Sequence, residues 1–543
     1  MHTLKGGRLA LWIVPVVFGL IAFAFRTLSV VDLANDHYMT LGWAQQVLFG
    51  AWPERDFVEP GMPLSYLVSA LIQRSWPGPF SELVFTSGML ALAAAVTTVC
   101  AARLGRAWAI GIFAALVELA FNPRFHSFPK ILTPVVAILL VQAYVRRPTR
   151  GRLAWMGLWT VVAFLLRHDL GVYAGVATVV GLLVMHGRAL NELMRAAIGY
   201  ASGMAILLVP YGIYVQWAVG WPEHIRRGFE FSKSDAHQLF SGLPGPDAIA
   251  QWNRDGAVAL LFYSVHAMVL LSILVIFVRR RRHSRETLAV AAASTAALVA
   301  FIPVILREPI DGRLTDLSAV FVLVMAWLLG ELVDVARLAY RVRPLRAGLA
   351  AAGAVAFSCL CAGSVWVLGD VPEQIDTTGV YQGWRGIRET WADLRDRGTV
   401  WPWARSWPTG DLPPTVRYLR DCTLPTDAVL LTWPAPEYAF FARRPFAAGQ
   451  VELLPPDAFT TERDQQQMLE HLSRERVPVL LTNEDRLDEF TRAYPEVARY
   501  LDGRYRPVGR FTLYDGSTVV VSTRAGLVST GVWGDDDWPC GFR

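Results

Sequence analysis

The sequence has little charge for its length and lacks the short motifs of several large enzyme classes. Asp, Glu, Lys and Arg make up 18% of its 543 residues, against about 25% in ordinary globular domains. The motifs GxxxxGK(S/T), HExxH, GxSxG and CxxC are absent, which argues against an ATPase, a zincin, a nucleophile-elbow hydrolase and a thiol redox enzyme. There is no Lys/Arg-rich tail and no zinc-type cysteine spacing, so the sequence does not indicate binding to nucleic acid.

Cysteine is scarce as well, with five residues in the chain. Cys100, Cys359 and Cys361 lie in apolar runs and are expected to behave as small hydrophobic residues. Cys422 and Cys540 lie in the polar C-terminal region, where they form either a disulfide or two unrelated thiols. We favour two unrelated thiols, because the sequence does not show whether the two Cα atoms lie within bonding range.

Apolar residues are abundant, and their arrangement in long runs predicts a multi-pass membrane protein. Hydrophobic residues make up 53% of the chain, and Trp, which is common at membrane interfaces, occurs 20 times. A helix needs about 20 apolar residues to cross a bilayer. Eleven runs approach or reach this length: 9–31, 83–102, 106–121, 129–145, 153–166, 170–186, 195–217, 257–278, 286–306, 315–336 and 347–368. The first run is too long for a cleaved signal peptide, so we expect a retained signal anchor.

The positions of the basic residues set the expected topology. With eleven spans and a cytoplasmic N-terminus, every dense Lys/Arg cluster falls on the cytoplasmic side of the plasma membrane, as the positive-inside rule requires. Residues 64–76 are apolar too, but counting this short run as a span would place all later clusters outside. We therefore expect an interfacial or re-entrant helix there. The extracytoplasmic segments are then 32–82, 122–128, 167–169, 218–256, 307–316 and everything after about 369.

The composition changes after residue 369, where the chain becomes charged and rich in Pro. Short β-like runs at 428–432, 477–482 and 518–522 alternate with helical patterns at 461–476 and 486–500, which is typical of a small α/β domain. The sequence therefore predicts a mainly α polytopic membrane protein in two domains. Residues 1–368 form about eleven transmembrane helices, and residues 369–543 form an extracytoplasmic α/β domain.

The functional interpretation depends on the polar loop 32–82. Its first part follows the first span directly and carries five acids: Asp32, Asp36, Glu54, Asp56 and Glu59. Residues 39–49 form an amphipathic pattern that predicts a helix at the interface, ended by Gly50. Ionisable side chains beside hydrophobic helix ends are costly unless they are paired or hydrated, so they are candidates for a functional site.

The order of features in this loop resembles the GT-C superfamily of multi-pass membrane glycosyltransferases, including its mannosyl- and aminoarabinosyl-transferases. The shared features are an acid after the first helix, a Tyr close behind, a Gly-Pro-Tyr-Arg-Asp-like segment and a Pro-bounded helix with a Tyr: here Asp36, Tyr38, residues 50–56, Pro63 and Tyr66. Residues 167–171, 313–316 and 428–446 resemble further segments of such proteins. The resemblance implies a GT-C-like fold and an inverting sugar transfer from a polyprenyl-phosphate donor to a glycan, lipid or protein acceptor.

The resemblance also implies roles for residues of the loop. Asp36 matches the acid that deprotonates the acceptor hydroxyl, which a carboxylate in a partly dry site can do because its pKa rises toward neutrality. The alternative is that Asp36 is the N-cap of the following helix. Tyr38, Trp52, Asp56 and Glu59 are candidates for binding the acceptor or the sugar, and the two aromatic residues also fit an interfacial belt.

The next outward loop, residues 122–130, departs from the family pattern because it contains no acid. A metal-bridged site with two carboxylates is therefore not favoured, and we expect no metal or other cofactor. Arg124, His126 and Lys130 suit the donor phosphate instead, because charge-assisted hydrogen bonds to phosphate are strong. The alternative for these residues is snorkelling toward lipid headgroups.

Two later segments add further candidates. Arg167, His168 and Arg313 are expected at the donor phosphate, since a guanidinium fork matches phosphate geometry and His titrates near neutrality. Asp169 and Asp316 are expected to orient these groups. The alternative for Arg167 and Asp169 is an ion pair that ties two helices together.

Two other functions are kept as alternatives. A transporter or flippase for a lipid-linked or anionic substrate needs paired charges near the bilayer midplane and often has broken helices in matching halves. Here the polar residues cluster at helix ends on one side. A non-catalytic scaffold that displays the C-terminal domain leaves the outward-facing Arg, His and Asp residues unexplained.

Overall fold

The apolar runs of the sequence form the helices that they predict. The computed structural model describes residues 10–30, 33, 35–58, 61–235, 240, 242–251, 253–307, 309–340, 343–397, 412–453, 460–513, 516–534 and 537–542. Eleven helices in this part coincide with the expected spans: α1 (Ala10–Leu28), α4 (Pro79–Gly105), α5 (Trp108–Ala120), α6 (Phe128–Arg146), α7 (Arg150–Leu166), α8 (His168–His186), α9 (Leu190–Ala218), α11 (Arg254–Arg279), α12 (Arg285–Ile305), α14 (Ser318–Ala339) and α15 (Pro344–Leu368). Among the described residues, eight helices are long and apolar enough to cross a membrane, while α1 and α5 are shorter apolar helices. The prediction of a mainly α polytopic protein is confirmed.

The chain folds into two compact units, each built from several segments. The helical unit contains Met1–Val31, Leu83–Pro210 and Gln238–Trp391, and the mixed unit contains Asp32–Glu82, Tyr211–His237 and Ala392–Arg543. This division differs from the two continuous domains, 1–368 and 369–543, that the sequence suggests. The loop 32–82 and the segment after α9 belong with the C-terminal residues.

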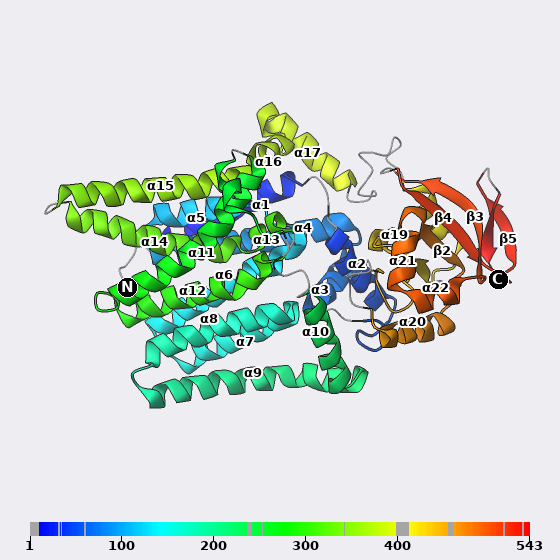
Figure 1. Ribbon diagram of the computed structural model, residues 1–543, viewed down its shortest axis with the longest axis horizontal. Coiled ribbons are helices and arrows are strands. Elements are labelled where there is room, and N and C mark those ends of the chain that lie inside the picture. Colours follow the sequence, from blue (N-terminus) through cyan, green and yellow to red (C-terminus); the bar gives the residue numbers. More distant parts are fainter. Residues whose placement is uncertain are drawn as a thin grey trace. The chain divides into compact units, whose positions relative to one another are not determined.

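The helical unit is organised around α14. Every residue of α14 from Ser318 to Glu331 is buried, as expected for a helix that is hydrophobic on all sides. It contacts α5, α6, α11, α12 and α15, and Figure 1 shows α14 and α15 running side by side. Short elements complete the unit: η1 (Phe125–Ser127), η3 (Pro246–Ala250), α13 (Ile310–Asp316), α16 (Val371–Thr377), η4 (Val380–Gln382) and most of α17 (Gly383–Arg397).

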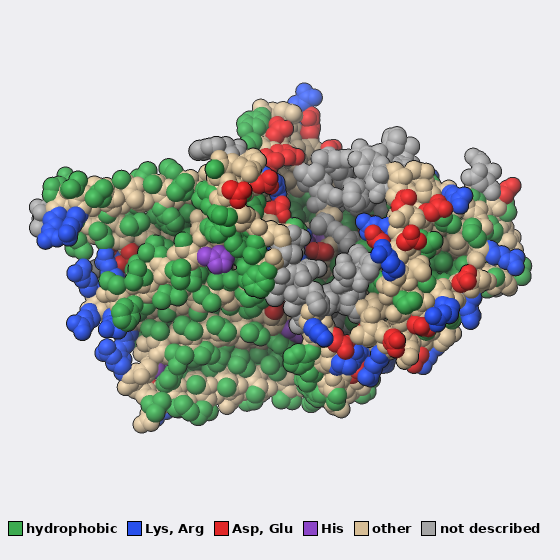
Figure 2. Space-filling view, viewed as in Figure 1, with side chains coloured by type: hydrophobic (Ala, Val, Ile, Leu, Met, Phe, Trp, Pro, Cys, Tyr) green, Lys and Arg blue, Asp and Glu red, His purple; other side chains and the backbone are tan. Residues whose placement is uncertain are grey.

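Basic side chains gather at one end of the helical unit. Figure 2 shows Lys and Arg at the end where α11 joins α12 and α14 joins α15, while hydrophobic side chains cover the flank of the helices in that view. This separation agrees with the grouping of basic residues expected from the positive-inside rule. Which membrane face that end occupies stays a prediction.

The mixed unit combines short helices with two sheets. Its helices are α2 (Asn35–Leu48), α3 (Pro63–Ser75), α10 (Trp221–Asp235), α18 (Pro414–Cys422), α19 (Pro436–Ala442), α20 (Glu462–Arg474), η6 (Glu484–Arg486), α21 (Leu487–Ala493) and α22 (Pro495–Leu501). Its strands are β1 (Val429–Leu431), β2 (Val479–Asn483), β3 (Tyr505–Thr512), β4 (Thr518–Arg524), β5 (Ser529–Trp533) and β6 (Trp538–Phe542). The larger sheet has the order β1-β2-β4-β3, with β1 and β2 parallel and the other pairs antiparallel.

Hydrophobic burial explains why the loop 32–82 joins the C-terminal residues. Trp43 and Tyr66, from α2 and α3, pack in one buried cluster with Phe57, Phe446 and Val451. These side chains are nearly solvent-free, and burying a large aromatic side chain stabilises a fold by about 1.5–3 kcal/mol. Burying the aromatic side chains of the loop 32–82 against the C-terminal residues therefore stabilises the folded chain.

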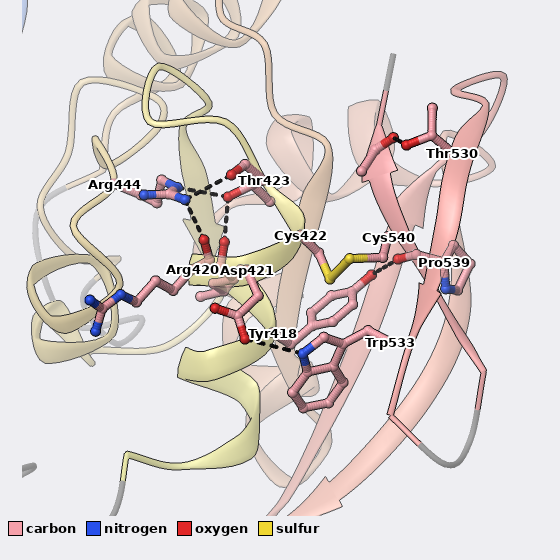
Figure 3. The surroundings of a disulfide bond; sticks show 12 residues. Tyr418, Arg420, Asp421, Cys422, Thr423, Arg444, Thr530, Trp533, Pro539 and Cys540 are labelled. Atoms are coloured by element: carbon pink, nitrogen blue, oxygen red, sulfur yellow. Dashed lines mark hydrogen bonds between the residues drawn. A yellow bond between two sulfur atoms is a disulfide. The ribbon is translucent and has the colours of Figure 1, made fainter.

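A disulfide between Cys422 and Cys540 joins α18 to β6. The favoured expectation of two unrelated thiols is therefore wrong. Figure 3 shows the bond with the side chains around it: the Tyr418 hydroxyl donates to the Pro539 carbonyl at 2.6 Å. The bond closes a loop across 118 residues, and such cross-links typically stabilise a domain by about 2–4 kcal/mol.

Candidate active site

Lys130 and Asp316 form a buried ion pair in the helical unit. Lys130 lies in the first turn of α6, and Asp316 is the last residue of α13. The Lys130 ammonium donates to the Asp316 carboxylate, and both side chains are almost fully buried. Burial alone would raise the pKa of Asp316, but Lys130 and the nearby His126 lower it, so the carboxylate stays ionised. Lys130 therefore does not snorkel toward headgroups.

Arg167 and Asp169 form a second ion pair at the start of α8. Arg167 precedes the helix with an extended backbone. Its Nε atom donates to Asp169 Oδ1 at 2.6 Å, and Nη2 donates to the other carboxylate oxygen. Arg167 is also the residue that ends α7, so the pair lies at the junction of α7 and α8. The neighbouring His168 is stacked on Phe164, with ring centroids 4.2 Å apart.

Three further guanidinium groups lie in the same part of the helical unit. Arg307 follows α12, and burial together with repulsion from Arg313 and Arg167 lowers its pKa to about 10, so it stays charged at neutral pH. The Arg124 guanidinium lies directly against Gly312, where a Cβ atom would collide with it. Because Gly312 has no side chain, the Arg124 guanidinium can lie against it. Gly312 directly precedes Arg313, so Arg124 lies close to Arg313 in the structure.

Five basic side chains gather in this part of the helical unit. Arg124, Lys130, Arg167, Arg307 and Arg313, together with Asp169 and Asp316, are termed the cationic cluster. Guanidinium and ammonium groups form strong charge-assisted hydrogen bonds to anions, so this described set suits the binding of an anion. Planar guanidinium groups suit phosphate in particular. Sequence reasoning selected Arg313 from the segment 307–316 and treated Arg307 as part of the general charge of that loop.

Asp36, the expected base, lies in the mixed unit and in the first turn of α2. Its side chain is exposed. The helix begins at Asn35, so Asp36 is its second residue and does not occupy the N-cap position. A carboxylate in the first turn is stabilised by the helix dipole. The adjacent His37 is buried, with its Nε2 atom 3.8 Å from Glu82 Oε1.

The residues expected to bind acceptor or sugar have different surroundings. Tyr38 is buried and its ring packs on two phenylalanines of α19. Trp52 is 49% exposed and meets Trp217 edge to face, with centroids 5.6 Å apart. Asp56 accepts a hydrogen bond from the Trp52 backbone N–H at 2.8 Å. Glu59 lies outside the described residues. The roles of these four residues stay predictions.

Glu54 has a role in the structure that sequence reasoning missed. It adopts a left-handed backbone, with φ at 63°, and its carboxylate is buried. The carboxylate pairs with His224 Nδ1 at 2.6 Å and accepts from Arg227 Nη1 at 3.1 Å. These partners follow it by 170 and 173 residues, so no local pattern could connect them.

A ligand set for a metal does not appear in the part of the chain that the structure describes. No group of three His, Cys, Asp or Glu side chains there could hold a metal ion. No step of a reaction is therefore assigned to a metal, and the expectation that none is needed stays a prediction.

The arrangement of the whole chain is similar to that of two solved proteins. ArnT from Cupriavidus metallidurans, bound to undecaprenyl phosphate, matches with a TM-score of 0.52 and 14% identity, over 95% of this chain and 99% of that chain. This ArnT and the oligosaccharyltransferase described in the next sentence both have the GT-C fold. The Archaeoglobus fulgidus oligosaccharyltransferase, in complex with zinc and sulfate, matches with a TM-score of 0.51 and 12% identity, over 93% of this chain and 72% of that chain.

The chain has the GT-C fold. The likeness extends over nearly its full length and includes both units, which confirms the fold implied by the sequence resemblance. At these identities the match concerns the fold alone. No protein-family model and no curated protein matches the sequence, so the GT-C fold is established here by structure.

Proposed function

We propose that this protein is a membrane glycosyltransferase that moves a sugar from a polyprenyl-phosphate donor to a glycan, lipid or protein acceptor. The cationic cluster is the observation that carries the proposal. Several guanidinium groups and one ammonium group lie together there, which suits an anion, and the ends of membrane-spanning helices are where a lipid-borne phosphate arrives. The undecaprenyl phosphate bound to ArnT, which shares the fold, supports this class of ligand.

In the proposed reaction, the oxygen of an acceptor hydroxyl attacks the anomeric carbon of the donor sugar. A new carbon–oxygen bond forms while the bond from the anomeric carbon to the phosphate oxygen breaks, and polyprenyl phosphate leaves. Arg167, Arg307, Arg313 and Lys130 stabilise the negative charge that develops on the departing phosphate. The energy comes from the donor, so the reaction needs no ATP.

In this reaction, Asp36 acts as the general base that removes the proton from the acceptor hydroxyl. An exposed carboxylate in the first turn of a short helix is accessible to a substrate, and general bases typically contribute about 10²–10⁴-fold to a rate. Trp52 and Asp56 are assigned to the sugar or acceptor, because the hydrogen bond from the Trp52 backbone N–H to the Asp56 carboxylate fixes a turn that also carries the half-exposed indole. The proposed reaction uses no divalent metal, and activity after dialysis against EDTA tests this.

The mixed unit is proposed to lie on the extracytoplasmic face of the plasma membrane, with the N-terminus in the cytoplasm. The disulfide between Cys422 and Cys540 supports this orientation, since disulfides persist in oxidising compartments and are rare in the cytosol. Labelling of intact cells tests it: after reduction, a membrane-impermeant thiol reagent is expected to modify both cysteines.

A transfer assay with purified protein in nanodiscs tests the function. Polyprenyl-phosphate sugars are offered with candidate acceptors, and the products are identified by mass spectrometry. Asp36→Asn is expected to lower kcat by about 10²–10⁴-fold. Glu389→Gln serves as the control, because Glu389 is paired with the exposed Arg385 within α17, and it should keep full activity. Full activity of Asp36→Asn would exclude Asp36 as the base, and uptake into proteoliposomes without any transfer would favour a transporter.

A further inference from the structure

Helix α10 exposes its apolar face and partly buries its polar face, which is the reverse of an amphipathic helix at the surface of a soluble protein. Between residues 221 and 230, the exposed positions are Trp221, Pro222, Ile225, Gly228 and Phe229, and all are uncharged. The polar side chains of the same stretch are the ones that are partly buried. Trp221, Ile225 and Phe229 are 41%, 49% and 73% exposed. Because they are spaced four residues apart, they form one stripe along the helix.

The polar face of α10 is held by the rest of the mixed unit. Glu223 accepts from Arg226 at 2.6 Å, and Arg226 also reaches Asp464 of α20 at 3.3 Å. Arg227 donates to Glu54 at 3.1 Å and to Gln467 of α20 at 3.0 Å. These contacts fix the rotation of the helix about its axis. The apolar stripe therefore faces away from α20 and from the turn at Glu54, and it cannot turn toward them without breaking the ion pairs.

The position of α10 in the chain indicates what lies against the stripe. Two residues separate it from α9, which is long and apolar enough to span a membrane. The last turns of α9 belong to the same unit. There Trp217 is 58% exposed and Trp221 packs against Gly212. Aromatic side chains at the end of a spanning helix mark the membrane–water interface, and Figure 1 shows α10 running across the direction of the last turns of α9, which belong to the same unit.

We propose that α10 lies in the membrane–water interface, with Trp221, Ile225 and Phe229 embedded in the lipid and its polar face bound to α20 and to the turn at Glu54. The lipid surface is the occupant that the chain itself specifies, because the end of α9 places the start of α10 at that depth. The helix thereby attaches α20 and the loop 32–82 to the bilayer surface. This inference does not depend on the proposed sugar transfer.

Spin-label accessibility in nanodiscs of phosphatidylcholine tests the proposal on the full chain. Cys100 and Cys361 are changed to Ala and Cys359 to Ser, which leaves the disulfide intact. Nitroxides are then attached at Phe229→Cys and, separately, at Ile225→Cys. The matched control is Val528→Cys, because Val528 is 70% exposed in the same unit and Phe229 is 73% exposed.

Collisions with oxygen, which concentrates in lipid, are compared with collisions with a water-soluble nickel complex. The ratio of oxygen to nickel collisions is expected to be several-fold higher at positions 225 and 229 than at 528. Equal ratios at the three positions would overturn the proposal. Dipolar broadening at 229 that disappears on dilution with unlabelled protein would also overturn it, because a second copy of the chain would then cover the stripe.

Discussion

The cationic cluster of the helical unit and the ion pairs around α10 in the mixed unit use the same residue types but differ in arrangement. The cluster gathers five basic residues with Asp169 and Asp316. The ion pairs around α10, termed the α10 network, set three arginines, Arg226, Arg227 and Arg463, against four acids, Glu54, Glu223, Glu230 and Asp464. In the network each arginine pairs with an acid of another segment, so its charges hold helices together. In the cluster, Arg307 lies close enough to Arg313 and Arg167 for their repulsion to lower its pKa, so its charges suit a ligand of opposite sign. The comparison teaches that the neighbours of a charge, more than its burial, separate a structural set of ion pairs from a candidate anion site.

The largest effect is expected from the buried pair inside the cluster. Lys130→Met leaves the Asp316 carboxylate buried without its ammonium, and breaking a buried pair in this way costs about 3–5 kcal/mol. The free energy of unfolding in detergent, from denaturant titration of wild type and variant, measures it. The double variant Lys130→Met with Asp316→Leu is expected to recover most of the loss. A stable single variant would show that the pair does not support the helical unit.

Removing one guanidinium group of the cluster is expected to weaken donor binding more than it lowers stability. Arg307→Gln and Arg313→Gln each remove a charged hydrogen-bond donor, which is worth about 1.5–3 kcal/mol or roughly 10- to 150-fold in Kd. Titration with polyprenyl phosphate measures the Kd. Arg227→Gln, from the α10 network, is the matched control and should bind as wild type does. Equal weakening in all three variants would erase the distinction between the two sets.

Within the α10 network, a lost charge is expected to reduce stability and not donor affinity. Glu54→Gln keeps one acceptor oxygen but loses the charge that faces His224 and Arg227, and this difference is worth about 1 kcal/mol. A lower melting temperature with an unchanged Kd for polyprenyl phosphate is the expected pattern. A changed Kd with an unchanged melting temperature would instead place Glu54 in the binding site.

The smallest effect is a pH dependence of the mixed unit. The hydrogen bond from Arg226 lowers the pKa of Glu223 from its ordinary 4.5 to about 2. Because the folded pKa lies below the unfolded one, the stabilisation is fully present above pH 4.5 and is lost as the pH falls toward 2. The melting temperature of wild type should therefore fall more steeply than that of Glu223→Gln between pH 5 and pH 3. Parallel curves would show that the pair contributes nothing.

The membrane part of the fold could be predicted from sequence because its signals are local. The length of an apolar run can be read from that segment of the sequence alone. The eleven runs form α1, α4 to α9, α11, α12, α14 and α15. Strands β1, β2 and β4 were found for the same reason. Strand β3 was missed because it is an edge strand with mostly partly exposed residues and Pro507 inside it. The helix expected over 486–500 is two helices, because Pro495 starts the second one.

The candidate site could be predicted only in part. Isolated Arg, Lys and Asp residues beside apolar runs drew attention to Lys130, Arg167, Arg313 and Asp36 in the sequence. The pairing of Lys130 with Asp316 spans 186 residues, and sequence patterns carry no information on such a contact. Arg307 was passed over because one arginine in a loop resembles another until packing places it beside Arg313 and Arg167.

By itself, the sequence determined that this is a multi-pass helical membrane protein with its basic residues at one end of the spans, since hydrophobic length and charge are properties of each segment alone. Only the tertiary structure decided that the loop 32–82, α10 and the C-terminal residues form one unit, that Cys422 bonds to Cys540, and that five cations share one place with two carboxylates. Those features depend on which distant side chains are buried together, and burial is a property of the folded chain.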